Sequence, residues 1–107
     1  MRYEVRGIAT YQETERVGGG TGRRAAIVLL QEPDETWSVR RFLDCPSGLR
    51  SLHGCIVTRS EDIARDVGGG LVEELLKDGW VRAPAQDAAA RSAVELLLAD
   101  EDLQAAA

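Results

Sequence analysis

Near the N-terminus, hydrophobic and polar residues alternate in the pattern of extended strands. From Tyr3 to Tyr11 every second residue is apolar or aromatic, apart from a glycine, which is the period of a half-buried strand over Arg2–Thr14. Residues 23–31 form a mostly apolar run of central-strand type, and Thr36–Leu43 alternates again. Two turn-forming segments, Gly18–Gly22 and Glu32–Glu35, separate these runs. The pattern predicts three strands, the first two joined as a hairpin.

A change to a helical period follows in the second half of the chain. Residues 44–54 contain proline and glycine and predict a loop, with a short fourth strand expected at Cys55–Thr58. Ser60 and the acids after it are typical of a helix start. Apolar residues then recur every four positions, which predicts a helix over residues 61–78. A second helix is predicted from Gln86 to Leu98, after Pro84.

Three adjacent glycines, Gly68–Gly70, fall in the middle of the first predicted helix. Each costs about 1 kcal/mol relative to alanine in a helix interior. The sequence leaves two structures open for this segment: a continuous helix whose backbone packs closely on a sheet, or two helical pieces joined by a hinge.

Strands followed by helices indicate the α+β class. We predict an antiparallel sheet of three to four strands with two helices packed on one face. The domain would span residues 1–99, and residues 100–107 would form a frayed C-terminal tail.

The composition indicates a globular domain but does not indicate a particular function. The 107 residues are 44% hydrophobic and 29% charged, as in an ordinary globular domain. No apolar run is long enough to cross a membrane and the N-terminus lacks the core of a secretory signal, so we expect a cytoplasmic protein with no membrane partner. Without such a signal, Cys45 and Cys55 are expected to be reduced thiols.

Charge is distributed unevenly along the chain. Residues 1–60 carry nine arginines against seven acids, whereas residues 61–107 carry four basic residues against eleven acids, for a net charge of −5. The acidic half would repel a polyanion, so nucleic acid is an unlikely partner.

Two stretches resemble the C-terminal domain of hydroxymethylbilane synthase (porphobilinogen deaminase). Residues 67–79 look like the helix of that domain, and Leu29–Arg40, with its Pro33-Asp34 turn, resembles the hairpin before it. Gly7–Tyr11 is similar to its opening strand. The resemblance implies a three-stranded antiparallel sheet with helices on one face. The cysteine that carries the family's cofactor has no counterpart near Glu4, and the family's catalytic residues belong to its other domains, so neither cofactor nor activity carries over.

Metal and nucleophile chemistry would depend on Cys45, His53 and Cys55, with Asp44 nearby. Their spacing matches no closed zinc motif. Burial of Cys55 in a strand, with His53 in a loop, explains them better than a site. We therefore predict no metal, no cofactor and no catalytic residue. The glycines of Gly18–Gly22 lead into a strand, which is not the context of a phosphate-binding loop.

Arginines on neighbouring strands are the strongest candidate site. We predict that some of Arg23, Arg24, Arg40 and Arg41 gather with Phe42 on an open face of the sheet and bind a protein partner. A solvated, salt-bridged face explains the same arginines, and the acidic C-terminal helix is a second candidate surface. The leading hypothesis is a small non-catalytic protein-binding or regulatory module of the inhibitor or immunity kind. The alternatives are a ligand-binding or accessory domain and a small cysteine-dependent enzyme.

Overall fold

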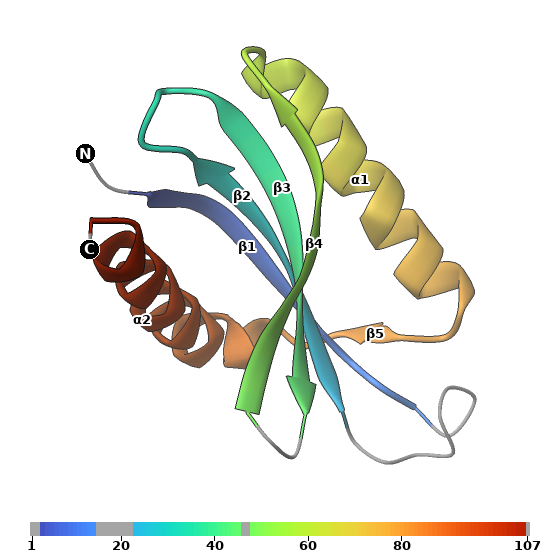
Figure 1. The fold of residues 1–107 in the computed structure, drawn as a ribbon. Helices are drawn as coiled ribbons and strands as arrows, with labels where there is room; N and C mark the ends of the chain where they lie inside the picture. Colours follow the sequence, from blue (N-terminus) through green and yellow to red (C-terminus); the bar gives the residue numbers. More distant parts are fainter. Residues whose placement is uncertain (1–2, 15–22, 46–47, 107) are drawn as a thin grey trace.

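The computed structural model describes residues 3–14, 23–45 and 48–106, and within these ranges the side chains outside 44–55 and 101–106. Five strands form one sheet in the order β4-β3-β2-β1-β5, and neighbouring strands are antiparallel (Figure 1). This confirms the α+β class and the antiparallel sheet. The elements in chain order are β1 (Glu4–Gln12), β2 (Arg24–Gln31), β3 (Trp37–Cys45), β4 (Gly48–Thr58), α1 (Glu61–Lys77), β5 (Val81–Arg82), the 3₁₀ helix η1 (Pro84–Gln86) and α2 (Asp87–Ala106).

The two helices cover opposite faces of the sheet (Figure 1). On β2, the side chains of Ala25, Ile27 and Leu29 join a buried cluster with α1, whereas those of the intervening residues join a second cluster with α2. The prediction of both helices on one face is therefore wrong. All six residues from Ala25 to Leu30 are buried, and a strand with no polar side must be covered on both faces.

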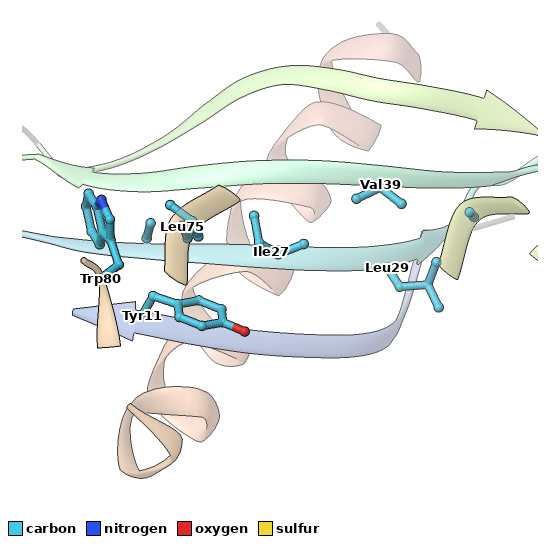
Figure 2. Packing of buried hydrophobic residues seen from close by; sticks show 8 residues of the cluster. Tyr11, Ile27, Leu29, Val39, Leu75 and Trp80 are labelled. Atoms are coloured by element: carbon cyan, nitrogen blue, oxygen red, sulfur yellow. The ribbon is translucent and has the colours of Figure 1, made fainter. Parts of the chain in front are cut away.

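The α1-side cluster draws residues from distant parts of the chain. Figure 2 shows Tyr11, Ile27 and Val39, which come from three neighbouring strands, together with Leu75 and Trp80. Leu75 belongs to α1 and Trp80 lies just after that helix. The cluster thus fixes α1 and the start of β5 against the same face of the sheet.

A β-bulge in β1 changes which side chains face which helix. The register of β1 against β2 shifts between Val5 and Gly7. Val5 therefore packs in the α2-side cluster, whereas Ala9 and Tyr11 pack in the α1-side cluster. Simple alternation predicted all of them on one side, which is wrong because the extra residue of a bulge reverses the facing of the strand beyond it.

The outer strands differ most from the predicted elements. β4 begins at Gly48, so most of the predicted loop at residues 44–54 is strand. Its pairing with β3 is irregular on both sides of Arg40, where β4 supplies more residues than β3. Glycine is common at such bulges. Gly54, which we interpreted as a sign of a loop, therefore lies within a strand. β5, at the opposite edge, has two residues and was not predicted.

Helix α1 is continuous through Gly68–Gly70, which decides between the two structures that the sequence left open. The Ser60 hydroxyl accepts a hydrogen bond from the Ile63 N–H at 3.3 Å, as a helix N-cap. At Gly68 an added Cβ would lie 3.9 Å from the nearest atoms, the Val39 methyl carbons. At Gly69 and Gly70 it would meet no described atom within 4 Å. Close backbone packing therefore does not require these glycines.

We expect Gly69→Ala and Gly70→Ala each to raise the free energy of unfolding by about 1 kcal/mol. Both sites are exposed and helical, so the added methyl group restricts the unfolded chain without a clash. Urea denaturation measures the change. Gly79→Ala is the matched control and should destabilise the protein, because Gly79 ends the helix with φ 98°. Equal effects at Gly69 and Gly79 would contradict the argument.

Helix α2 continues through Ala106, beyond the predicted end at Leu98. Neither α1 nor α2, over its described residues, is long and apolar enough to span a membrane.

Candidate functional site

The predicted arginine patch is divided between the two faces of the sheet. Arg40 pairs with Val28, which faces α2, whereas Arg41 pairs with Ile27, which faces α1. Phe42 is only 1% exposed and lies in the α2-side cluster. The expectation that Phe42 is exposed is therefore wrong, because its face of β3 is part of the core. A role for the arginines in binding a partner stays a prediction.

Arg23 neutralises a buried carboxylate. Its Nε atom lies 2.8 Å from Glu13 Oε2, and its backbone N–H donates to the same oxygen at 3.2 Å. The Glu13 side chain is fully buried, whereas 41% of the Arg23 side chain is exposed. Because an isolated buried charge is costly, this pair explains Arg23 as a structural residue between β1 and β2.

Arg40 is held on the α2 face by its neighbours. Its guanidinium lies over the Tyr3 ring, 5.1 Å from the centroid, and its Nη2 atom donates to the Tyr3 hydroxyl at 3.3 Å. Glu32 lies 3.6 Å away, and only 17% of the Arg40 side chain is exposed. Arg40 therefore joins the N-terminal segment to β3. Arg41, on the other face, has a buried Nε with no hydrogen-bond partner among the described residues.

Arg24 is the predicted arginine that borders a cavity. We call this cavity, of about 280 Å³, the Arg24 pocket. It lies between α2 and the first two strands, and Arg24 Nη1 donates to Gln86 Oε1 at its edge, at 2.6 Å. Much of the remaining wall is alanine, whose small side chain leaves space between helix and sheet. The lining residues are Thr10, Arg24, Ala25, Ala26, Gln86, Ala89, Ala90 and Ala93.

Thr10 adds a buried hydroxyl to this pocket. The residue is 2% exposed, and its Oγ1 atom has no hydrogen-bond partner in the described structure. Its backbone is satisfied, because its carbonyl accepts from the Ala83 N–H at 2.8 Å and its N–H donates to Asp87 Oδ1 at 3.0 Å. A buried unsatisfied hydroxyl is unfavourable in a folded protein, and the buried Ser38 hydroxyl shares this property with Thr10.

An ion pair beside the pocket fixes the start of α2. Arg82 Nη1 and Nη2 donate to the two carboxylate oxygens of Asp87 at 2.8 and 2.6 Å. These bonds from Arg82, with the bond from the Thr10 N–H, hold the pKa of Asp87 below its ordinary value despite partial burial. The Arg82 guanidinium also lies 5.7 Å from the centroid of the Tyr11 ring. Burial raises the pKa of Tyr11 more than Arg82 lowers it.

The side chains of Cys45, His53 and Cys55, and the whole of Gly18–Gly22, lie outside the residues described at this level. Among the side chains that are described, no group of three metal-ligating residues comes together. The hypotheses of a metal site or a reactive cysteine at these residues therefore stay untested predictions.

Sequence reasoning found Arg24 but missed the rest of the pocket. Thr10 looked like an ordinary outward-facing strand residue. The alanines at positions 89, 90 and 93 could have indicated a cavity, because alanine side chains are too small to fill the space between a helix and a sheet. Which strand residues lie beneath that face could not be read from the local pattern.

Comparison with protein-family models, with curated proteins and with solved structures gives no significant match. The resemblance to hydroxymethylbilane synthase stays a prediction.

Proposed function

We propose that the chain is a small non-catalytic protein-binding module, of the regulatory or inhibitor kind. Its partner would dock on the α2-side face of the sheet at Val57 of β4 and the adjoining turn between β2 and β3. The observation that carries the proposal is the unequal cover of the two faces. Helix α1 packs on β2, β3 and β4, whereas α2 lies mainly over β1 on the other face, and its cluster reaches β2 and Phe42 of β3 but includes no described residue of β4.

Val57 marks the uncovered part of this face. It pairs with Ser38, which lies on the same side of β3 as Phe42 and therefore faces α2. The Val57 side chain is 64% exposed, although Ser38 beside it is buried. An exposed apolar side chain next to a buried row is suited to a partner that completes the cover.

A hollow of about 420 Å³ adjoins this side chain at the turn between β2 and β3. We call its lining the Val57 surface. Tyr3, Pro33 and Val57 supply apolar contact area, and Asp34 is exposed at the same place. The exposed Asp34 carboxylate favours a partner segment that combines apolar and basic side chains. The lining residues are Tyr3, Glu32, Pro33, Asp34, Thr36 and Val57.

We expect Val57→Lys to weaken partner binding by at least about tenfold, which corresponds to the loss of one well-packed interface side chain. Lysine is tolerated on edge strands, so the fold should be kept. Affinity capture from a lysate of the source organism would identify the partner by mass spectrometry, and calorimetry with the purified pair would give the affinity.

Leu76→Lys is the matched control, because Leu76 is 51% exposed on α1, which covers the opposite face. It should bind the partner as the unmodified protein does. Equal loss in both variants, or equal retention in both, would contradict docking on the Val57 surface. Arg40 is a poorer probe, since its side chain is mostly buried.

A further inference from the structure

Beyond this protein-binding role, we propose that two copies of the chain form a homodimer in which their β4 strands pair antiparallel, edge to edge. β4 stands at the end of the sheet order, and its partner in the described sheet is β3. It is long for an edge strand, with 11 residues from Gly48 to Thr58. The pairing would join the two sheets into one, and it does not require the partner proposed above.

The two edges of the sheet differ in how their backbone groups are used. At the β1 edge, β5 pairs with Tyr11 and Gln12, and the backbone groups of Thr10 are bonded to Asp87 and Ala83. At the other edge, no strand lies beyond β4 in the described sheet (Figure 1). Short strands, lysine, proline and bulges all block such an edge. β4 has bulges in its middle but is not short, and it contains neither lysine nor proline.

The hydrogen-bond pattern of the sheet shows which way the backbone of Val57 points. The Glu32 N–H donates to the Thr36 carbonyl at 2.8 Å, so Thr36 directs its backbone groups toward β2. Alternate residues of a strand direct these groups to the same side, so Ser38 also bonds to β2. Ser38 is paired with Val57, and this pair is therefore of the non-hydrogen-bonded kind. The Val57 N–H and carbonyl consequently point away from β3, toward the open edge.

The backbone of Leu49, near the other end of β4, points the same way. Leu49 pairs with Asp44, which lies an even number of residues after Ser38 on a strand whose register with β2 is regular. Asp44 therefore directs its backbone groups toward β2 and leaves those of Leu49 at the open edge. Leu49 and Val57 are equally far from His53, the midpoint of β4. Two strands that overlap completely thus place Leu49 of one copy opposite Val57 of the other, and each such pair can exchange two hydrogen bonds.

Charge and side-chain exposure also favour a second copy as the occupant of this edge. With histidine neutral, Arg50 is the one charged residue in the sequence of β4, and the same overlap places it opposite Ile56 of the other copy. Like charges are therefore not directly opposed, which would be destabilising. The Val57 side chain is 64% exposed, and a neighbouring strand would cover part of it. A second copy presents its outward backbone groups at the matching positions by symmetry.

Sedimentation equilibrium on the whole purified chain tests the proposal. We expect the mass to rise with concentration toward twice that of the monomer. Val57→Pro removes an outward N–H, and proline is tolerated where the N–H of an edge strand faces solvent. This variant should weaken the dimer at least about tenfold. Val57→Thr is the matched control, because it keeps both the N–H and the β-branched shape, and it should dimerise as the unmodified protein does.

Amide hydrogen exchange measured by NMR locates the contact. The amides of Leu49 and Val57 should exchange at least about tenfold more slowly in the dimer than in dilute monomer. A monomer at all concentrations up to about 1 mM would overturn the proposal. Fast exchange of both amides in a dimeric sample, or a dimer that persists in folded Val57→Pro, would place the contact elsewhere and also overturn it. If Val57→Pro does not fold, the exchange rates of the unmodified protein decide.

The dimer and the partner-binding role fail separately. Sedimentation uses the purified chain alone, whereas the partner is tested by comparing Val57→Lys with Leu76→Lys. A monomeric chain that binds its partner through the Val57 surface would overturn the dimer alone. A dimer with protected Leu49 and Val57 amides that binds no partner would overturn the protein-binding role alone.

Discussion

Replacing Phe42 with alanine is expected to lower the free energy of unfolding by about 3–5 kcal/mol. The side chain is 1% exposed and belongs to the cluster with Val94 and Leu98. Truncation would remove apolar contacts on both the sheet and α2, and the surrounding backbone of the sheet cannot collapse into the space. Urea denaturation followed by circular dichroism gives the change.

Phe42→Leu is the control, since it keeps an apolar side chain of similar kind and should cost much less than Phe42→Ala. A loss of less than about 1 kcal/mol in the alanine variant would show that Phe42 is not a core residue. If Phe42→Ala also lost partner binding without loss of stability, the original expectation of a binding residue would be restored.

Replacing Asp87 with asparagine is expected to lower the free energy of unfolding by about 2 kcal/mol at neutral pH. The change weakens the paired bonds from Arg82 and the bond from the Thr10 N–H, and hydrogen bonds to a charged group contribute about 1.5–3 kcal/mol. The loss should be largest at neutral pH because the carboxylate is ionised there.

The pH dependence follows from the depressed pKa of Asp87 in the folded protein. In the unfolded chain an aspartate titrates near about 3.9. The stabilisation is therefore fully present above that value and is lost as the pH falls through the lower pKa of the folded state. The difference in stability between the unmodified protein and Asp87→Asn should shrink on acidification below about pH 4.

Urea denaturation at a series of pH values measures this difference. Asp100→Asn, which removes an exposed carboxylate from the same helix, is the control and should change the free energy of unfolding little at neutral pH. A difference for Asp87→Asn that stayed constant down to pH 3 would show that the carboxylate charge does not stabilise the start of α2.

The Val57 surface and the Arg24 pocket lie on the same side of the sheet but are made by different elements. The first uses the β2–β3 turn and the end of β4, and the second uses η1, α2 and the first two strands. The lining residues of the two do not overlap. Variants in one should therefore leave the other intact.

Local patterns in the sequence determined most of the individual elements. The alternation of β3, the apolar run of β2 and the four-residue recurrence in α1 were each visible without knowledge of the fold, because the period of each element is set by its own backbone geometry. The start of α1 followed from Ser60 and the acids after it. These features depend on neighbours a few positions away in the chain.

The facing of the elements was decided by the tertiary structure. A residue added to a ladder, such as Arg6 in β1 or Cys55 in β4, reverses the facing of the strand beyond it, and its effect depends on the partner strand. The position of α2 depended on β5, which pairs with β1 at the sheet edge. The chain passes this edge after α1, so α2 starts on the opposite face (Figure 1).

The residues that line the Arg24 pocket were likewise decided by the tertiary structure. Arg24 was a candidate from its charge alone, but Thr10 meets Asp87 across 77 positions of sequence, and Arg24 meets Gln86 across 62. A cavity is a property of which small side chains face one another, and burial in a core is decided by the packing of whole elements. The sequence by itself determined where β1, β2, β3 and α1 form and where α2 begins. The tertiary structure decided the extent of β4, the pairing of β5, which side chains are buried and where space is left.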